Sequence, residues 1–446
     1  MTQSPSSPSL APTEALDRLR PYQRQGARFL EERRAALLAD EMGLGKTVQA
    51  IVALRTALPQ TESQRALVVA PASLRLNWLR EFRTWAPELT VRVVQGTAQD
   101  RRAYYALPIS VLITSYDQIR TDAHSLPAGL SFGITLLDEA QRIKNVDSST
   151  ALGVRLLPRH RAWALTGTPL ENTPADVAAI FQYLRPGTVS PGMSRSEMIE
   201  AVQGFMLRRT KDEVLGELPP IIVQDMPLDL AGQQRQRYEE LWSQRHQLGD
   251  QTTAEASNSF ALITKLKQLC NLDIQSGESV KLDALRLVCE NLVGEEDKLL
   301  VFSQYVTSLR FLQKKLGIQT LLYHGELTDL EKDRVLDEFR NRPGPLALLV
   351  SLSAGAVGLN LQEASTIVLF DRWWNPAVED QAINRAHRFG RTRPLHVFRF
   401  LVTDSIEQRI EEVLSEKREL FDAYVNQPDW EAHLRVSPDE LNRILR

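Results

Sequence analysis

The chain has 446 residues, of which 43% are hydrophobic and 24% charged, the balance of a folded globular protein. At about 150 residues per domain, this length predicts roughly three structural units. No run of about 18 apolar residues occurs, so we expect no membrane-spanning helix and no membrane partner. The 53 Lys and Arg residues against 56 Asp and Glu residues give a net charge of −3, which permits a nucleic-acid partner only through a local basic cleft.

Residues 1–16 are rich in Ser and Pro and lack the basic start and apolar stretch of a signal peptide, which predicts a disordered leader. The two cysteines, Cys270 and Cys289, are too few for a disulfide framework or a structural zinc site. We therefore expect no zinc and a reducing compartment inside the cell. That compartment is the cytoplasm, in association with the nucleoid, for a bacterial or archaeal protein, and the nucleus for a eukaryotic one.

Short apolar runs alternate with amphipathic helical stretches in two blocks of the chain. Continuous apolar runs of this length predict strands that are buried on both faces of a parallel sheet. Two such blocks predict an α/β fold with two lobes. The runs of the first block are 36–40, 66–70, 109–115, 134–139 and 161–167, and those of the second are 298–304, 320–324, 346–351, 366–371 and 396–401.

The stretch from about 175 to 280 contains few strand signals and several polar, helical patterns. Pro219 and Pro220 mark a break within it. The chain closes on an amphipathic helical pattern that we expect to pack on the second lobe. The predicted boundaries are 17–228 for the first lobe with a first helical insertion, 229–280 for a helical insertion or linker, 281–420 for the second lobe and 421–446 for a C-terminal helical tail.

A phosphate-binding loop is predicted by the sequence DEMGLGKT at 40–47, between an apolar run and a helical pattern. Gly43, Leu44 and Gly45 form the turn, whose glycines let backbone N–H groups point at phosphates. Lys46 is expected to reach the β- and γ-phosphates of ATP, and Thr47 to hold Mg²⁺. The strict pattern has Gly at the first position, where this chain has Asp40.

Two carboxylates, Asp138 and Glu139, end the apolar run that begins at 134. Alone, such a pair is typical of a solvated strand end. Together with the phosphate loop, Asp138 is predicted to bind Mg²⁺ and Glu139 to act as the general base that activates the attacking water.

Weaker signals surround these segments. Gln23 lies upstream of the phosphate loop, where its amide could bind an adenine edge or remain exposed on a helix. The hydroxyls in 166–169 (TGTP) either couple the ATP site to the other lobe or make a simple turn.

The second lobe carries arginines and tryptophans with alternative interpretations. Arg385 and Arg388 are three apart, on one face if the segment is helical, which suits arginine fingers supplied in cis or a surface cluster. The glycine-rich stretch 353–360 either approaches a phosphate backbone or makes a tight bend. Trp373 and Trp374 either wedge against nucleic acid or fill a hydrophobic gap.

In chain order, these motifs resemble those of the Swi/Snf-type DNA-dependent ATPases of helicase superfamily two. The resemblance covers about 17 to 415 and is most specific in DEMGLGKT, LTGTPLEN, RRTKDEV and the Trp-Asn-Pro segment. It implies two tandem RecA-like lobes and a motor that tracks duplex DNA without separating the strands. The matching segments are PYQRQG (21–26), DEMGLGKT (40–47), VVAPASLRLNW (68–78), ITSYD (113–117), DEAQ (138–141), LTGTPLEN (165–172), FMLRRTKDEV (205–214), VFSQY (301–305), YHG (323–325), SAGAVGLNL (353–361), DRWWNP (371–376) and QAINRAHRFG (381–390).

The resemblance also implies roles for individual residues. The implied ATP-binding residues are Gln23 at adenine, Gly43, Leu44, Gly45, Lys46 and Thr47 at the phosphates, and Arg385 and Arg388 as fingers. Thr47 and Asp138 are the implied Mg²⁺ ligands, and Glu139 is the implied base. The implied DNA-contacting residues are Thr114, Gly355 and Trp374.

The chain departs from the family pattern in three places. Gln141 replaces the His of the DEAH box, which changes the predicted coupling to LTGTP. Arg391 adds a guanidinium where the family has HRIGQ, and it either joins the ATP site or contacts DNA. Ala356 replaces the second glycine of the second-lobe turn.

No cysteine-rich finger, basic tail or histone-binding module is evident in the sequence. We therefore expect a minimal motor of prokaryotic type that moves along double-stranded DNA and displaces or remodels a bound protein. The alternatives are a strand-separating helicase and a nucleotide-gated interaction subunit that a partner activates.

Overall fold

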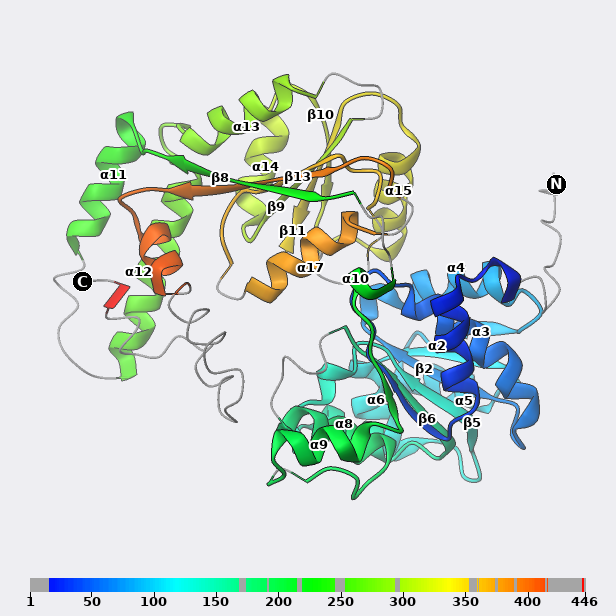
Figure 1. The fold of residues 1–446 in the computed structure, drawn as a ribbon. Helices are drawn as coiled ribbons and strands as arrows, with labels where there is room; N and C mark the ends of the chain where they lie inside the picture. The colour runs from blue at the N-terminus through cyan, green and yellow to red at the C-terminus, as the bar shows by residue number, and fades with distance from the viewer. Residues whose placement is uncertain are drawn as a thin grey trace. The chain divides into compact units, whose positions relative to one another are not determined.

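The apolar runs of the chain form two separate parallel sheets, each with helices packed on it (Figure 1). They belong to two units, Met1–Gly216 and Glu217–Arg446. This computed structural model confirms the predicted α/β class with two tandem RecA-like lobes. The structure describes residues 16–167, 174–190, 192–214, 219–244, 253–292, 297–352, 359, 361–373, 376–388, 391–413, 415 and 443–444.

The first unit is built on a seven-stranded sheet of order β3-β4-β2-β5-β6-β1-β7, in which every pairing is parallel. The predicted apolar runs all became strands, because strands buried on both faces need continuous apolar sequence. Two short strands at the edges of this sheet, β3 and β7, were not predicted. The strands are β1 (Ala35–Leu38), β2 (Ala66–Ala70), β3 (Val91–Val93), β4 (Val111–Ser115), β5 (Phe132–Leu137), β6 (Arg159–Leu165) and β7 (Met206–Leu207).

Helices connect these strands, and several begin at a capping box, in which the first and fourth residues exchange hydrogen bonds. Thr97 with Asp100, and Ser115 with Gln118, start helices in this way. The α-helices are α2 (Pro21–Glu31), α3 (Lys46–Ala57), α4 (Arg75–Trp85), α5 (Ala98–Ala106), α6 (Tyr116–Asp122), α7 (Ser149–Arg155), α8 (Pro174–Leu184), α9 (Arg195–Val202) and α10 (Lys211–Val214).

The second unit is built on a six-stranded sheet of order β10-β11-β9-β12-β13-β8, again with parallel pairings throughout. Its central strands bury Leu, Val, Ile and Phe side chains on both faces of the sheet. The strands are β8 (Ile221–Leu228), β9 (Lys298–Ser303), β10 (Gln319–Tyr323), β11 (Leu346–Ser351), β12 (Thr366–Leu369) and β13 (Leu395–Val402).

Strand β8 corrects the predicted boundary between the lobes. It pairs with β13 from Ile221 opposite Leu395 to Leu228 opposite Val402, so 217–228 belong to the second unit rather than the first. This strand was missed because it lies at the sheet edge, where polar residues and a proline are tolerated and a continuous apolar run is not needed.

The helical segment that was predicted as an insertion or linker packs on the second unit. Tyr238 and Leu266 from this segment share a buried apolar cluster with Ile406 and Ile410, which lie in the helical stretch 406–413 that follows β13. The amphipathic pattern near the end of the chain is therefore helical over 406–413, while the predicted tail 421–446 lies outside the described residues except for 443–444 and stays a prediction. The remaining helices are α11 (Gly232–Ser243), α12 (Thr253–Asn271), α13 (Val280–Glu290), α14 (Val306–Lys315), α15 (Asp329–Asn341) and α17 (Pro376–Ala386).

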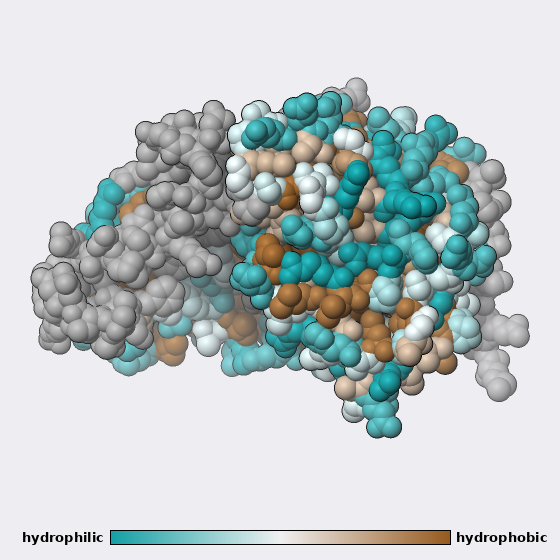
Figure 2. Space-filling model, turned by 90° about the horizontal axis from the view of Figure 1, so that it is seen from below, coloured by the Kyte–Doolittle hydropathy of each residue, from teal (hydrophilic) through white to brown (hydrophobic). Residues whose placement is uncertain are grey.

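The surface seen from below mixes hydrophilic side chains with smaller groups of hydrophobic ones (Figure 2). Exposed large apolar side chains such as Leu152, Leu156 and Ile274 are of a kind common on globular proteins. Among the helices that the structure describes, none combines the length and the apolar character needed to cross a membrane.

Candidate ATP site

The loop between β1 and α3 has the backbone of a phosphate-binding turn. Gly43 and Gly45 have φ angles of 92° and 75°, a left-handed conformation that costs glycine little and other residues more. Gly45 is the N-cap of α3, and Lys46 is its first residue. The unpaired N–H groups of the first helical turn, together with the positive end of the helix dipole, make this end of α3 suitable for a phosphate.

Lys46 turns back toward its own loop. Its Nζ donates to the backbone carbonyl of Asp40 at 2.6 Å and to that of Glu41 at 3.2 Å. An ammonium that is bound by neutral carbonyls can exchange them for a phosphate oxygen, which offers a stronger charge-assisted hydrogen bond. The geometry therefore agrees with the predicted role of Lys46.

Gln23 packs directly against this turn, although it lies 21 residues before Leu44 in the chain. A Cβ atom at Gly45 would meet the Gln23 Nε2 at 2.6 Å, so the glycine is needed for this close approach. The Gln23 amide donates to the Leu44 carbonyl at 3.3 Å and accepts from the Arg20 N–H at 3.1 Å. The structure places Gln23 at the loop, and its contact with adenine stays a prediction.

Asp138 follows the last residue of β5 and is buried. The indole N–H of Trp78 donates to Asp138 Oδ2 at 2.8 Å, and the Glu139 N–H donates to Oδ1 at 3.0 Å. Burial, followed by the negative charge of Glu139, raises the pKa of Asp138 to about 7. These donors orient the carboxylate without neutralising it.

The donor set fits Mg²⁺. This ion prefers oxygen ligands and is usually held by one or two carboxylates together with substrate phosphates. Asp138 offers a buried carboxylate at the end of β5, and Thr47 offers a hydroxyl in the first turn of α3. A divalent cation would also counter the unfavourable burial of the Asp138 charge.

The Glu139 side chain is held by Gln141, which follows it two positions later in the chain. Its backbone is left-handed, with φ 54°, which is a strained conformation for a residue with a side chain. The Gln141 amide donates to Glu139 Oε2 at 2.7 Å, and the Thr166 hydroxyl donates to Gln141 Oε1 at 3.0 Å. Gln141, the departure from the DEAH pattern, therefore links the predicted base to the end of β6.

The stretch after β6 also approaches the phosphate loop. A Cβ atom at Gly167 would meet the Met42 side chain at 2.6 Å and the Lys46 Nζ at 3.6 Å. Thr166 thus couples these segments and does more than form a turn, while Thr168 and Pro169 lie outside the described residues. The phosphate loop, the Asp138–Gln141 segment and the end of β6 meet within one unit.

Asp40 has a partner that sequence analysis did not identify. The Arg209 guanidinium donates to both Asp40 carboxylate oxygens, from Nε at 3.0 Å and from Nη2 at 2.5 Å. Gln49 donates to Asp40 at 3.1 Å and also to the Leu44 carbonyl at 3.1 Å. All three side chains are buried. Position 40 therefore has Asp because its carboxylate anchors the loop to the RRTKDEV segment.

Glu41, the neighbour of Asp40, makes a second link between the phosphate loop and the RRTKDEV segment. The Lys211 backbone N–H donates to Glu41 Oε2 at 2.7 Å, and its ammonium lies 3.7 Å from Glu41 Oε1. The RRTKDEV motif was part of the resemblance, but no role was predicted for it. Its signal was the motif itself, since its partners lie about 170 positions earlier in the chain.

The predicted arginine fingers lie in the second unit, and only Arg385 lies in a helix there. Arg385 is a buried residue of α17, but the helix ends at Ala386, so Arg388 lies beyond it. There the Arg388 N–H donates to the Ala386 carbonyl at 3.0 Å, which closes a tight turn, and the His387 ring contacts the Pro219 carbonyl at 2.9 Å. The two arginines do not share a helical face, and their role at ATP stays a prediction.

The residues predicted near DNA have different outcomes. Thr114 is fully buried in β4 and its hydroxyl donates to Gln118 at 3.0 Å, which contradicts a direct DNA contact. Gly355 and Trp374 lie outside the described residues. Arg391 donates to the carbonyls of Ala364 at 2.7 Å and Pro394 at 2.8 Å, so it supports the loops before β12 and β13.

Comparison with known families agrees with this geometry. The model of the SNF2-related domain matches residues 22–274, which is more than half of the chain, and that of the helicase conserved C-terminal domain matches 281–390. The chain belongs to the SNF2-related family. The predicted resemblance is thereby confirmed.

Individual relatives of this SNF2-related chain are longer. An ATP-dependent helicase of Mycoplasma pneumoniae is 34% identical over 90% of this chain, and the ISWI chromatin-remodeling complex ATPase ISW2 of Saccharomyces cerevisiae is 30% identical over 95%. The chain spans 42% of the length of each. The solved SWI2/SNF2 ATPase core of Sulfolobus solfataricus in complex with dsDNA is 29% identical, with 96% of both chains covered and a TM-score of 0.45.

Proposed function

We propose that this SNF2-related chain hydrolyses ATP with Mg²⁺ to translocate along double-stranded DNA, and that it displaces or remodels protein bound there. The observation that carries the proposal is the hydrogen-bonded series from Glu139 through Gln141 to Thr166, whose neighbour Gly167 lies against the phosphate loop. Such a series links the hydrolysis site to a second motif, as a motor requires and a simple nucleotide store does not.

Binding of ATP is assigned to the loop and the first turn of α3. The N–H groups of 43–47 receive the phosphates, and Lys46 exchanges its carbonyl partners for β- and γ-phosphate oxygens. Thr47 and Asp138 supply oxygen ligands to Mg²⁺, which when bound neutralises phosphate charge. Trp78 keeps the Asp138 carboxylate oriented for this contact.

Hydrolysis is assigned to Glu139 as the general base. The Glu139 carboxylate accepts a proton from the water that attacks the γ-phosphate. Gln141 holds one carboxylate oxygen and so leaves the other for that water. Arg385 and Arg388 are proposed to stabilise the charge that develops on the γ-phosphate.

A strand-separating helicase is the second candidate, because the Mycoplasma pneumoniae relative has the name of an ATP-dependent helicase. Both candidates share the ATP chemistry. A forked duplex with a labelled strand distinguishes them, since only the helicase releases that strand.

The proposed function is tested by measuring ATP turnover alone, with single-stranded DNA, with duplex DNA and with RNA. Duplex DNA is expected to stimulate turnover most. Glu139→Gln is expected to lower the stimulated rate by about 100- to 10,000-fold, the range attributed to a general base. Asp147→Asn, which removes an exposed carboxylate further along the same segment, is the control and should retain the rate. Equal rates with and without nucleic acid would overturn the proposal.

A further inference from the structure

A basic hollow lies at the amino ends of the strands of the second sheet. Its walls are the start of β9, the end of α15 with the residues that follow it, and the turns before β12 and β13. Its volume of about 530 Å³ is within the range of roughly 300–1,000 Å³ that is typical of small-ligand sites. Five cations face one carboxylate in the described lining, which contains Lys298, Arg340, Arg342, Arg391, Arg393 and Glu363.

Lys298, the first residue of β9, is a buried cation whose hydrogen-bond partners are neutral. Its side chain lies in a residue that is 6% exposed, and its Nζ donates to the carbonyls of Phe339 at 2.5 Å and Arg340 at 2.7 Å. Burial lowers the pKa of Lys298, and the charge of Glu363 opposes this effect only in part. Within the described part of the chain, no carboxylate forms an ion pair with this ammonium.

Arg391 lines the same hollow and also binds neutral groups. Its guanidinium donates to the carbonyls of Ala364 at 2.7 Å and Pro394 at 2.8 Å, while its Nε is buried without a hydrogen-bond partner. Burial lowers the pKa of Arg391, and the positive charge of Arg393 lowers it further. Arg391 therefore combines an unused donor with a repulsion that an anion in the hollow would relieve.

Two further arginines stand at the rim, where their side chains are exposed. Arg393 donates to Asp297 at 2.7 Å, and the Arg342 guanidinium lies 2.5 Å from Glu338. Exposed ion pairs contribute little to stability. These arginines can therefore exchange their carboxylate partners for the charged groups of a ligand at little cost.

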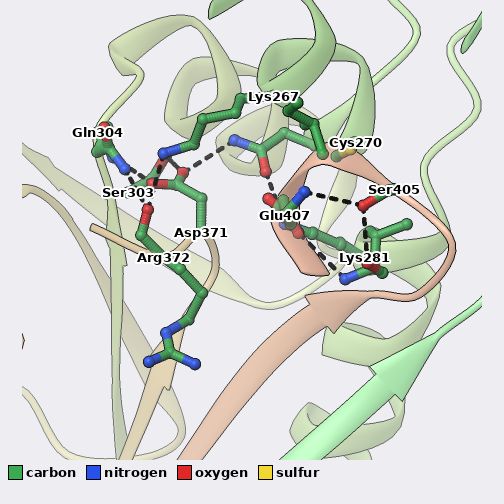
Figure 3. Close-up of polar contacts among 12 residues, drawn as sticks. Lys267, Cys270, Lys281, Ser303, Gln304, Asp371, Arg372, Ser405 and Glu407 are labelled. Carbon is green, nitrogen blue, oxygen red and sulfur yellow. Dashed lines mark hydrogen bonds and ion pairs between the residues drawn. The ribbon is translucent and has the colours of Figure 1, made fainter. Parts of the chain in front are cut away.

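The carboxyl ends of the same strands show a different treatment of buried cations (Figure 3). There Lys281 pairs with Glu407 at 2.6 Å, and neither side chain is exposed. Arg372, just after β12, pairs with Glu379 at 3.0 Å. A buried charge is costly unless it is paired, and at this end of the sheet the chain supplies the counter-charges itself. At the amino ends, the described residues supply only Glu363.

We propose that the basic hollow binds a small anion that carries several phosphate groups. Phosphate oxygens accept strong charge-assisted hydrogen bonds from ammonium and guanidinium groups, and their charge balances the cations. Several phosphate groups match five cations better than a single phosphate does. The site goes beyond the proposed function, because neither ATP hydrolysis nor movement along DNA uses these residues.

Two observations define the class of ligand. No aromatic side chain occurs in the described lining of the basic hollow, which favours recognition of charged groups over stacking on a nucleobase. Lys298 is buried, so a group must enter the hollow to approach it, and a DNA duplex is too wide to do so. These observations favour a small polyphosphate over the backbone of a nucleic acid.

The test measures binding of inorganic tripolyphosphate to the full chain by titration calorimetry. All chains carry Lys46→Met, which removes the ammonium of the phosphate loop and so weakens binding there. We expect Arg391→Gln to weaken tripolyphosphate binding by about tenfold or more, because it removes a charged donor. Arg334→Gln is the matched control, since it removes the same charge from an exposed position on α15 and should leave the affinity unchanged.

Because Arg391 also supports two loops, its variant is first checked by thermal unfolding. If it does not fold, Arg393→Gln at the rim supplies the same test, with a smaller loss of affinity expected. Absence of tripolyphosphate binding, or equal binding by the hollow variant and Arg334→Gln, would overturn the proposal. Displacement of tripolyphosphate by a duplex oligonucleotide at equal phosphate concentration would overturn the assignment to a small anion. None of these outcomes depends on ATP turnover, so failure here leaves the proposed function untouched.

Discussion

Both units bury an aspartate at the end of a strand or loop and bind it from a distant segment, but they do so differently. In the first unit, Asp40 meets Arg209 directly, through two charged hydrogen bonds. In the second unit, Asp371 accepts hydrogen bonds from Asn271, Ser303 and the Gln304 backbone, and the charge of Lys267 lies nearby. The first arrangement concentrates the electrostatic stabilisation in one residue, whereas the second spreads it over several. Loss of a single group should therefore be felt most in the first unit.

The largest effect is expected for Arg209→Met, which leaves the Asp40 charge buried and unpaired. Breaking one partner of a buried ion pair costs about 3–5 kcal/mol. Urea unfolding should show this loss, and calorimetry should show weaker ATP binding, because Asp40 also anchors the phosphate loop. Arg208→Met is the control, since Arg208 is its exposed neighbour. Equal unfolding free energies of Arg209→Met and Arg208→Met would mean that the Asp40–Arg209 pair does not stabilise the first unit.

A smaller effect is expected for Lys281→Met in the second unit. Lys281 pairs with Glu407 at 2.6 Å, and neither side chain is exposed. Glu407 keeps a second partner in the Val402 N–H, so we expect a loss of about 3 kcal/mol, at the lower end of the range for a broken buried pair. Chemical denaturation measures it. A loss of unfolding free energy larger than that of Arg209→Met would show that the electrostatic stabilisation of the second unit is not spread over several residues.

Gln141→Ala tests the hydrogen-bonded series rather than the buried charge. It releases the Glu139 carboxylate and the Thr166 hydroxyl, and we expect kcat to fall by about tenfold, equivalent to about 1.4 kcal/mol of transition-state stabilisation. The KM for ATP should change little, because no phosphate contact is lost. Gln141→His, which restores the pattern of the DEAH box, should recover most of the rate. A change in KM alone would contradict this account.

The smallest effect is expected for Asp225→Asn at the edge of the second sheet. Asp225 on β8 receives two hydrogen bonds from Arg399 on β13, at 2.5 and 2.6 Å, but the Asp225 carboxylate is exposed to solvent. Exposed pairs contribute about 0–1 kcal/mol. The melting temperature should therefore shift only slightly, and less at high salt. A destabilisation as large as that of Lys281→Met would mean that the ion pair, and not the backbone hydrogen bonding, holds β8 against β13.

Sequence patterns correctly predicted the elements whose residues all lie in the same environment, such as strands that are buried on both faces. The runs at 66–70 and 346–351 became β2 and β11 because strands buried on both faces must be apolar along their whole length. The phosphate loop was predictable because glycines and a lysine at fixed spacing have few other uses. In contrast, β8 is an edge strand with polar residues, so its sequence resembles a connection.

Contacts between distant segments were beyond the reach of sequence patterns. Nothing local indicates that Arg209 pairs with Asp40 across 169 positions, or that Lys267 reaches the Arg372 carbonyl. Nor did the spacing of Arg385 and Arg388 show that α17 ends between them, at Ala386, where the next residue, His387, contacts Pro219 from a distant part of the chain. Such features depend on tertiary packing, which only the folded chain shows.

The central claim, movement along duplex DNA, is tested most directly by displacement of a third strand from a duplex. A labelled oligonucleotide is bound as a triplex near one end of a long duplex, and its release is followed after ATP addition. Movement along duplex DNA predicts release of the third strand by the wild-type chain, none by Glu139→Gln, and no separation of the duplex strands. Duplex-stimulated ATP hydrolysis without release of the third strand would contradict it.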